Sequence, residues 1–250
     1  MRTPETGHNR TGLATASADA REGVESMVAA QPAGDLEAEL GGDGLAELRA
    51  RCARDTDGVG SVPPPATVAG KVKSAIGTLS GASMAVFMDR LGQRLAFERQ
   101  GSRLYEGLIA KFRAAETDGD LGRHAPELED LIELHDEELQ HFLLLRRTIA
   151  DLGGDPTAQT PAADVSSVAG MGLPQVVNDP RTTFWQSLEA MLVAELVDND
   201  GWETLQHLAH GLGYEELAAQ FGLAREEEAD HLRRVRTWLN LATMDQAGAT

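Results

Sequence analysis

The sequence predicts an all-α protein: a four-helix bundle with one long crossover connection, preceded by a disordered N-terminal tail. Three observations lead to this prediction. From Ala82 onward the apolar residues recur every three or four positions, which is the period of a helix that buries one face. Turn sequences divide this part of the chain into four long segments, and no alternating strand pattern competes with them. The first third of the chain, by contrast, has no aromatic residue.

The N-terminal segment, residues 1–66, is expected to be an acidic, disordered tail. It contains eleven acidic residues against six arginines and no aromatic residue. Such a segment buries too little apolar surface to offset the entropy lost on ordering it. A Val-Pro-Pro-Pro sequence at 62–65 is typical of a stiff, extended linker. Residues 35–53 favour at most a short, minor helix, and 67–81 are expected to lead into a bundle over 82–245.

The first pair of helices is predicted over residues 82–115 and about 126–152. A Thr-Asp-Gly-Asp sequence at 117–120 indicates the turn between them. Pro126 is expected in the first turn of the second helix, where its missing N–H costs nothing. Two glycines at 153–154 are expected to end that helix.

The second pair of helices follows a connection rich in Gly, Pro and Ala at about 153–178. Asp179-Pro180 predicts an N-cap followed by proline at the first helical position. The third helix is expected to end at Gly211-Leu212-Gly213, and the fourth to run from about 214 to 241. A connection of this length can pass along a whole neighbouring helix, so one crossover is expected rather than a simple up-and-down order.

Charge and cysteine content exclude several function classes. The net charge of −18 argues against nucleic acid or an anionic membrane as a partner. Cys52 is the single cysteine, so the sequence has neither a disulfide framework nor a Cys-x-x-Cys site. No apolar run is long enough to cross a membrane, and the N-terminus lacks the apolar stretch of a secretory signal. A cytoplasmic location is therefore expected.

Each predicted helix carries a carboxylate at the centre of its apolar face, and two helices also carry a histidine one turn on. In chain order these residues are Glu98, Glu138 with His141, Glu195, and Glu228 with His231. A buried carboxylate is costly unless it is paired or binds a cation. Because the neighbouring inward positions are expected to hold no Lys or Arg, two divalent metal ions are predicted to balance the four carboxylates. The alternative is a metal-free core held by buried salt bridges and hydrogen bonds.

The depth of these residues supports the metal interpretation. In an antiparallel helix pair, residues equally far from the turn lie at the same level. Glu98 and Glu138 are equidistant from residue 118, inside the first turn, and Glu195 and Glu228 are equidistant from a point beside Gly211–Gly213. Glu98 is therefore expected level with Glu138, and Glu195 level with Glu228.

The two helix pairs also repeat each other. Tyr105 follows Glu98 by seven residues and Trp202 follows Glu195 by seven, which suggests a duplicated helix pair. Both aromatic residues are interpreted as ordinary core residues; the alternative is that they tune the site or carry oxidising equivalents. Glu-x-x-His by itself is a weak motif, since the sequence also contains it at 5–8, so the repeat and the common depth carry the argument.

Residues 82–241 resemble the ferritin-like superfamily, and their ligand pattern is closest to rubrerythrins and bacterioferritins. Those di-iron bundles use a Glu from each of two helices and Glu-x-x-His from each of the other two. The resemblance implies that Glu98 and Glu195 are terminal ligands and that Glu138 and Glu228 bridge the two metals. The same resemblance implies that His141 and His231 each cap one metal. It also implies that Asp198, three residues after Glu195, is an additional ligand or a partner of the ligands. The rubredoxin module of rubrerythrins, with its Cys-x-x-Cys, has no counterpart in this sequence.

The expected function is that of a redox enzyme or ferroxidase-type protein with two iron ions, or with Mn or a mixed Mn/Fe pair. It would act on O₂ or peroxide, need an external electron donor, and by analogy could form a homodimer. Iron storage and a metal-free interaction module are the alternatives. The acidic residues beside the ligands are expected to be solvated and at most to guide cations inward; they are Asp136, Glu137, Glu226 and Glu227.

Overall fold

The computed structural model describes residues 46–47, 50–51, 53–54 and 81–249. The chain divides into two compact units, Met1–Gly58 and Val59–Thr250, which are described separately. In the first unit the described residues are helical, close to the short helix that the sequence favours at 35–53. The remaining predictions for the tail, the Pro-rich linker and the lead-in to residue 80 lie outside the described residues.

Residues 81–249 form six helices and, within that range, no strand, which confirms the all-α class. The helices are α4 (Gly81–Asp118), α5 (Leu128–Asp151), α6 (Pro161–Ala169), α7 (Gly172–Asn178), α8 (Phe184–Gly211) and α9 (Glu215–Gln246). Among the described residues, no helix combines the length and the apolar character needed to cross a membrane.

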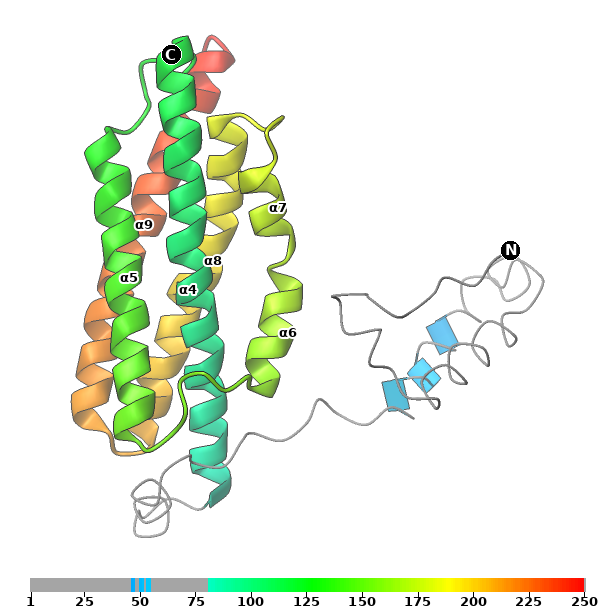
Figure 1. Cartoon of the computed structure of the whole chain (residues 1–250), viewed down its shortest axis with the longest axis vertical. Helices are drawn as coiled ribbons and strands as arrows, with labels where there is room; N and C mark the ends of the chain where they lie inside the picture. Colours follow the sequence, from blue (N-terminus) through cyan, green and yellow to red (C-terminus); the bar gives the residue numbers. More distant parts are fainter. Residues whose placement is uncertain (1–45, 48–49, 52, 55–80, 250) are drawn as a thin grey trace, which may run out of the picture. The chain divides into compact units, whose positions relative to one another are not determined.

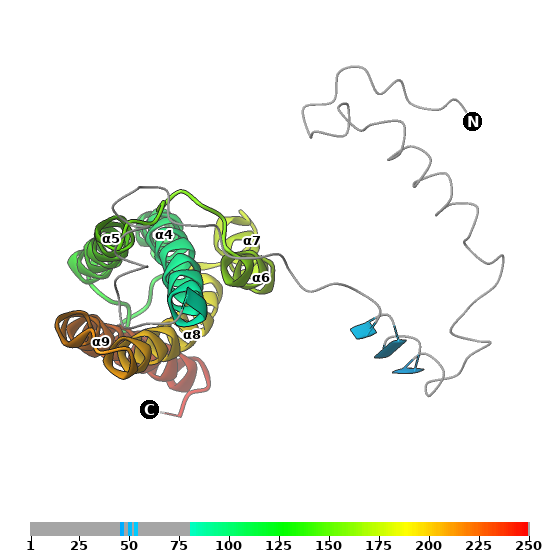
Figure 2. The same ribbon diagram turned by 90° about the horizontal axis from the view of Figure 1, so that it is seen from below.

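The four long helices surround a common centre. Seen end-on, α4, α5, α9 and α8 follow one another around it, while α6 and α7 lie outside against α4 and α8 (Figure 2). Figure 1 shows that α4 and α5 run in opposite directions, as do α8 and α9. The segment with α6 and α7 returns the chain along the length of the long helices, so α8 begins at the end where α5 begins (Figure 1).

Helix α5 begins later than its proline suggests. The Asp130 carboxylate accepts a hydrogen bond of 3.0 Å from the backbone N–H of Glu127, which is the N-cap. Pro126 therefore precedes the cap, and the prediction that it lies in the first turn is wrong. The Asp130 side chain, three residues after the cap, satisfies the Glu127 N–H, and this bond marks the start of the helix.

Helix α8 also begins later than predicted. Thr183 is its N-cap: the hydroxyl accepts from the Gln186 N–H at 3.2 Å, and the Gln186 side chain accepts from the Thr183 N–H at 2.9 Å. Asp179-Pro180 instead ends α7, where the Asp179 carboxylate accepts from the Arg181 N–H at 2.9 Å. The reciprocal pair of capping bonds satisfies two free N–H groups and so outweighs the single Asp-Pro signal.

The connection between α5 and α8 is more regular than the sequence indicates, because it contains α6 and α7. Thr160 caps α6 by accepting from the Ala163 N–H at 3.3 Å, and Pro161 is the first helical residue. The Thr160 hydroxyl also donates to the Asp89 carbonyl at 3.2 Å, which ties the start of α6 to α4. Because this segment is rich in Gly, Pro and Ala, the sequence predicted a connection here and not two short helices.

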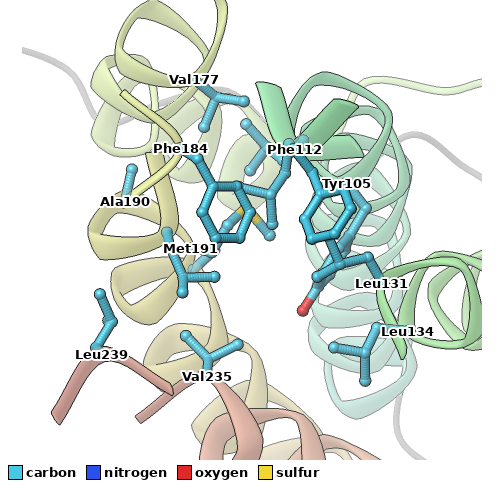
Figure 3. Packing of buried hydrophobic residues seen from close by; sticks show 14 of the residues in the cluster. Tyr105, Phe112, Leu131, Leu134, Val177, Phe184, Ala190, Met191, Val235 and Leu239 are labelled. Carbon is cyan, nitrogen blue, oxygen red and sulfur yellow. The ribbon is translucent and has the colours of Figure 1, made fainter. Parts of the chain in front are cut away.

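Two apolar clusters fill the centre of the second unit. We call the first the Phe184 cluster; it includes Leu104, Tyr105, Leu108, Phe112, Leu131, Leu134, Phe184, Leu188, Met191, Val235 and Leu239 (Figure 3). The second, the Phe221 cluster, includes Phe87, Leu91, Leu95, Leu145, Ile149, Trp202, Leu205, Ala218, Phe221 and Ala224. Each long helix contributes to both clusters, so each crosses the layer between them.

Candidate metal centre

The layer between the two clusters holds all seven residues that the sequence singled out. They are Glu98 from α4, Glu138 and His141 from α5, Glu195 and Asp198 from α8, and Glu228 and His231 from α9. None of these residues is more than 2% exposed. Polar groups meet here because the apolar stripe of each helix is interrupted at this level. Burying five carboxylates together requires compensation by cations or protons.

The ligand atoms form three overlapping groups, in each of which the atoms lie within 4.8 Å of one another. The first group is Glu138, Glu195, Glu228 and His231; the second is Glu98, His141 and Glu228; the third is Glu98, Glu138, Asp198 and Glu228. Glu228 belongs to all three groups and Glu138 to two. We call Glu195 with His231 the Glu195 half and Glu98 with His141 the Glu98 half, and the halves share Glu138 and Glu228.

In the Glu195 half, the terminal carboxylate divides its two oxygens between a protein donor and the interior of the site. The Tyr105 hydroxyl donates to Glu195 Oε1. Glu195 Oε2 lies 3.7 Å from Nδ1 of His231. Figure 3 shows the Tyr105 hydroxyl oxygen at the edge of the Phe184 cluster. Tyr105 is thus a core residue, as expected, that also holds the terminal glutamate with one oxygen free for a cation.

In the Glu98 half, the donor is an arginine that the sequence interpretation missed. Arg94 is 5% exposed, and its Nε lies 2.9 Å from Glu98 Oε1, while Nη2 lies 3.0 Å from Asp198 Oδ1. Glu98 Oε2 lies 3.7 Å from Nδ1 of His141. The expectation that no Lys or Arg is near is therefore wrong. Arg94 escaped notice because it lies beside the central apolar stripe of α4, with its guanidinium over the Phe97 ring.

The charge balance survives this correction. Arg94 offsets one of the five buried carboxylates, so four negative charges remain, as two divalent cations require. The guanidinium also donates hydrogen bonds to the backbone carbonyl oxygens of Val197 and Asp198, at 3.4 and 3.5 Å. These contacts with α8 hold the side chain between the two helices.

The histidines have acidic partners outside the layer, and these also correct an expectation. His141 Nε2 lies 2.8 Å from Glu227 Oε2, and His231 Nε2 lies 2.7 Å from Glu137 Oε2. Glu227 and Glu137 are half-exposed, but they are hydrogen-bonded rather than merely solvated. A carboxylate at Nε2 keeps a proton on that nitrogen and leaves Nδ1 to face the site.

The arrangement is reciprocal, because each outer glutamate comes from the helix of the other histidine. The sequence signal was available: both motifs read Glu-Glu-x-x-His, at 137–141 and 227–231. The other two acidic neighbours, Asp136 and Glu226, lie exposed as expected.

The pKa values in the site follow from burial without a bound cation. Burial raises the pKa values of three glutamates, with neighbouring carboxylates adding to the effect; they are Glu98, Glu138 and Glu195. Burial likewise raises the pKa of Asp198 to about 7, although Arg94 opposes it. Glu228 differs: burial opposes its ionisation, but ion-pair contacts with Nδ1 of His141 and of His231, at 2.7 and 3.4 Å, lower its pKa to about 2. Metal-free, the site thus holds protons where cations could bind.

The donor set passes a simple test for metal binding. Buried polar atoms that lack a well-formed hydrogen bond gather here, including both oxygens of Glu98 and Glu228 and Nδ1 of both His141 and His231. Native interiors rarely leave such atoms without partners. Mixed carboxylate and imidazole donors suit first-row transition metals such as iron and manganese. The Glu and His clusters could therefore bind metal ions.

Two glycines make room for the site. A Cβ on Gly101 would lie 2.1 Å from Glu138 Oε2, and one on Gly201 would lie 1.9 Å from Arg94 Nη1. Gly101 is the buried residue at this level of α4, and its neighbour Ser102 is only half-buried. The missing side chains let α5 bring Glu138 close to α4, and let Arg94 lie against α8.

Comparisons with known proteins gave no match: no protein-family model, no curated protein and no solved structure is significantly similar to this chain.

Proposed function

We propose that this chain is a ferritin-like dinuclear metal protein, with two iron ions or an Mn or mixed Mn/Fe pair, that acts as an oxidoreductase of the ferroxidase or peroxide reductase type. One observation carries the proposal: two Glu-x-x-His motifs and two further glutamates, one set from each long helix, meet in a single buried layer. The long return between α5 and α8 supports the ferritin-like connectivity.

Each residue has a role in this proposal. Glu138 and Glu228 would bridge the two ions, because each of them shares one group with Glu195 and at least one other group with Glu98. Glu98 and Glu195 are terminal ligands, and each histidine binds through Nδ1. Asp198 acts as the partner of Arg94 rather than as a primary ligand, since its Oδ1 faces the guanidinium at 3.0 Å.

The bound ions would supply a two-electron redox couple for O₂ or peroxide. The chain contributes the surroundings. The apolar clusters exclude bulk water, Tyr105 and Arg94 hold the terminal glutamates, and the outer glutamates set the histidine tautomers. Because the sequence has a single cysteine and no Cys-x-x-Cys, electrons would come from an external donor.

The test is a metal count. Metal-free protein titrated anaerobically with Fe(II) should bind two ions per chain, measured by elemental analysis after gel filtration. Air should then produce a near-ultraviolet absorption band. Glu138→Ala with Glu228→Ala should abolish binding, because both bridges are lost. The matched control, Asp136→Ala with Glu226→Ala, removes exposed acids from the same helices and should still bind two.

Other results would favour the alternatives. Many ions per chain would indicate storage in an assembly. The absence of uptake would favour a metal-free interaction module. Two ions retained by the Glu138→Ala, Glu228→Ala variant would show that the bridges are assigned to the wrong residues.

A further inference from the structure

The two halves of the site depart from their internal repeat at two positions. Four residues before the terminal glutamate, the Glu98 half has Arg94 and the Glu195 half has Met191. Three residues after the terminal glutamate, the Glu98 half has Gly101 and the Glu195 half has Asp198. Arg94 and Asp198 are the partners of one buried ion pair, with 3.0 Å between Nη2 and Oδ1. The asymmetry is therefore concentrated in a single interaction beside the Glu98 half.

This ion pair changes what Glu98 can offer to a cation. Glu98 Oε1 forms an ion pair with a charged guanidinium, 2.9 Å from Arg94 Nε, whereas Glu195 Oε1 accepts a hydrogen bond from the neutral hydroxyl of Tyr105. A charged partner in contact with a carboxylate offsets more of its negative charge than a neutral hydrogen-bond donor does. A positive charge at this distance also repels a second cation, and burial strengthens that repulsion.

Asp198 does not cancel this effect. At longer range Asp198 offsets the charge of Arg94, but it leaves the ion pair between Arg94 Nε and Glu98 Oε1 in place. The carbonyl oxygens of Val197 and Asp198 hold the guanidinium from the other side. In the Glu195 half the corresponding Met191 is fully buried and uncharged, so nothing at that position competes with a cation for Glu195.

We propose that the two metal positions are unequal: the Glu195 half binds the first divalent ion tightly, the Glu98 half binds the second more weakly, and Arg94 sets the difference. Arg94 acts as a positioning residue through Glu98. The inference rests on the proposed dinuclear function and adds an order of loading to it.

The experiment is a calorimetric titration of metal-free protein with Mn²⁺, which measures binding without turnover. The wild type should show two steps with affinities that differ at least about tenfold. His141→Ala should lose the weak step and His231→Ala the tight one. Arg94→Met introduces the residue that the Glu195 half has at the corresponding position. It should tighten the weak step about tenfold or more and leave the affinity of the tight step within about threefold of the wild-type value.

Two further variants separate charge from packing. Arg94→Lys keeps a cation near Glu98 and should keep the spread of affinities, while Arg94→Gln removes the charge and should narrow it even if Arg94→Met folds poorly. Met191→Leu, at the corresponding position, should change neither step.

Several outcomes would overturn the inference. They are two equal steps in the wild type, a spread that survives both neutral substitutions of Arg94, or loss of the weak step in His231→Ala. In each of these cases the wild-type chain still binds two ions, so the proposed function stands. A wild-type chain that binds no Mn²⁺, and no Fe(II) in the metal count, would overturn both.

Discussion

The helix pairs α4–α5 and α8–α9 carry the same ligands in different surroundings. In both pairs a glutamate faces a Glu-x-x-His motif at equal depth, and in both an outer glutamate bonds the histidine of the other pair. The first pair adds Arg94 beside its terminal glutamate, whereas the second adds Asp198. The repeat supplies the clustered Glu and His residues, while Arg94 and Asp198, which the repeat does not share, place different charges beside the two terminal glutamates.

The aromatic residues extend this comparison. Tyr105 and Trp202 hold corresponding positions and are both buried, yet Tyr105 donates to Glu195 while the Trp202 ring packs edge-on against His141, with 5.2 Å between ring centroids. The phenol orients a ligand by a hydrogen bond, and the indole fixes a histidine ring by contact alone. Equivalent positions therefore support the site in different ways.

The largest effect is expected from the two glycines. Gly101→Ala places a Cβ 2.1 Å from Glu138 Oε2, so the flexible carboxylate should turn away and both ions should lose a bridge. We expect Mn²⁺ affinity to fall about 100-fold or more, which exceeds the usual cost of losing an outer partner. Thermal stability of the metal-free chain should hold or rise, because alanine favours helix over glycine by about 1 kcal/mol.

Gly201→Ala is the matched comparison. Its Cβ would meet Arg94 Nη1 and push the guanidinium toward the pocket of about 180 Å³ that Arg94 lines between α4, α6 and α8. This variant should change the weak step only. Calorimetry that finds the same loss of both steps in the two glycine variants would contradict the difference between the halves.

A smaller effect is expected from the outer glutamates. Glu137→Ala should weaken the tight step, through His231, and Glu227→Ala the weak step, through His141, each by about 10-fold to 100-fold. The Glu137 effect should be larger because its side chain is 34% exposed against 50% for Glu227. Replacement by Gln keeps an acceptor and should retain most of the affinity. If calorimetry shows that each variant weakens the opposite step, the pairing across helices is wrong.

The smallest expected effect is a pH dependence of the metal-free protein. Asp198 has an ordinary pKa of 3.8 and a folded pKa of about 7, so the folded chain takes up a proton in this window and stability falls as pH rises through it. Glu98, Glu138 and Glu195 act in the same direction. The pKa of His141 rises to about 10, mainly through Glu227 and against burial, so its contribution is lost between pH 6.5 and about 10.

Scanning calorimetry should therefore show the Tm of the metal-free chain falling by about 5 °C or more between pH 5 and pH 8. Glu228 is the exception: its pKa is lowered from 4.5 to about 2, so its contribution to stability is lost only as the pH falls through that range. Bound Mn²⁺ should reverse the trend, because it requires deprotonated carboxylates. Asp198→Asn should flatten the slope below pH 7; an unchanged slope would place that proton elsewhere.

The Glu137 and Gly101 predictions depend on features that helical periodicity does not show. Periodicity was sufficient to predict the all-α class, the four long helices and a layer that holds seven buried polar residues. It could not show that Glu137 reaches across to His231, or that a glycine lies behind Glu138. Such contacts depend on how each helix is rotated about its axis and which neighbour it meets. The helix starts at Leu128 and Phe184 also depended on competing caps rather than on prolines.

By itself the sequence determined which residues share a face and a depth, because a helix repeats every 3.6 residues and an antiparallel turn sets equal distances on both sides. That was enough to place Glu98 level with Glu138 and Glu195 level with Glu228. Only the tertiary structure decided where Arg94 lies, because position 94 borders the apolar stripe and turns inward or outward according to what α8 presents. At this position α8 offers Asp198 and the space beside Gly201. The Arg94 guanidinium is therefore buried beside the Glu98 half, and the Glu195 half has no corresponding charge.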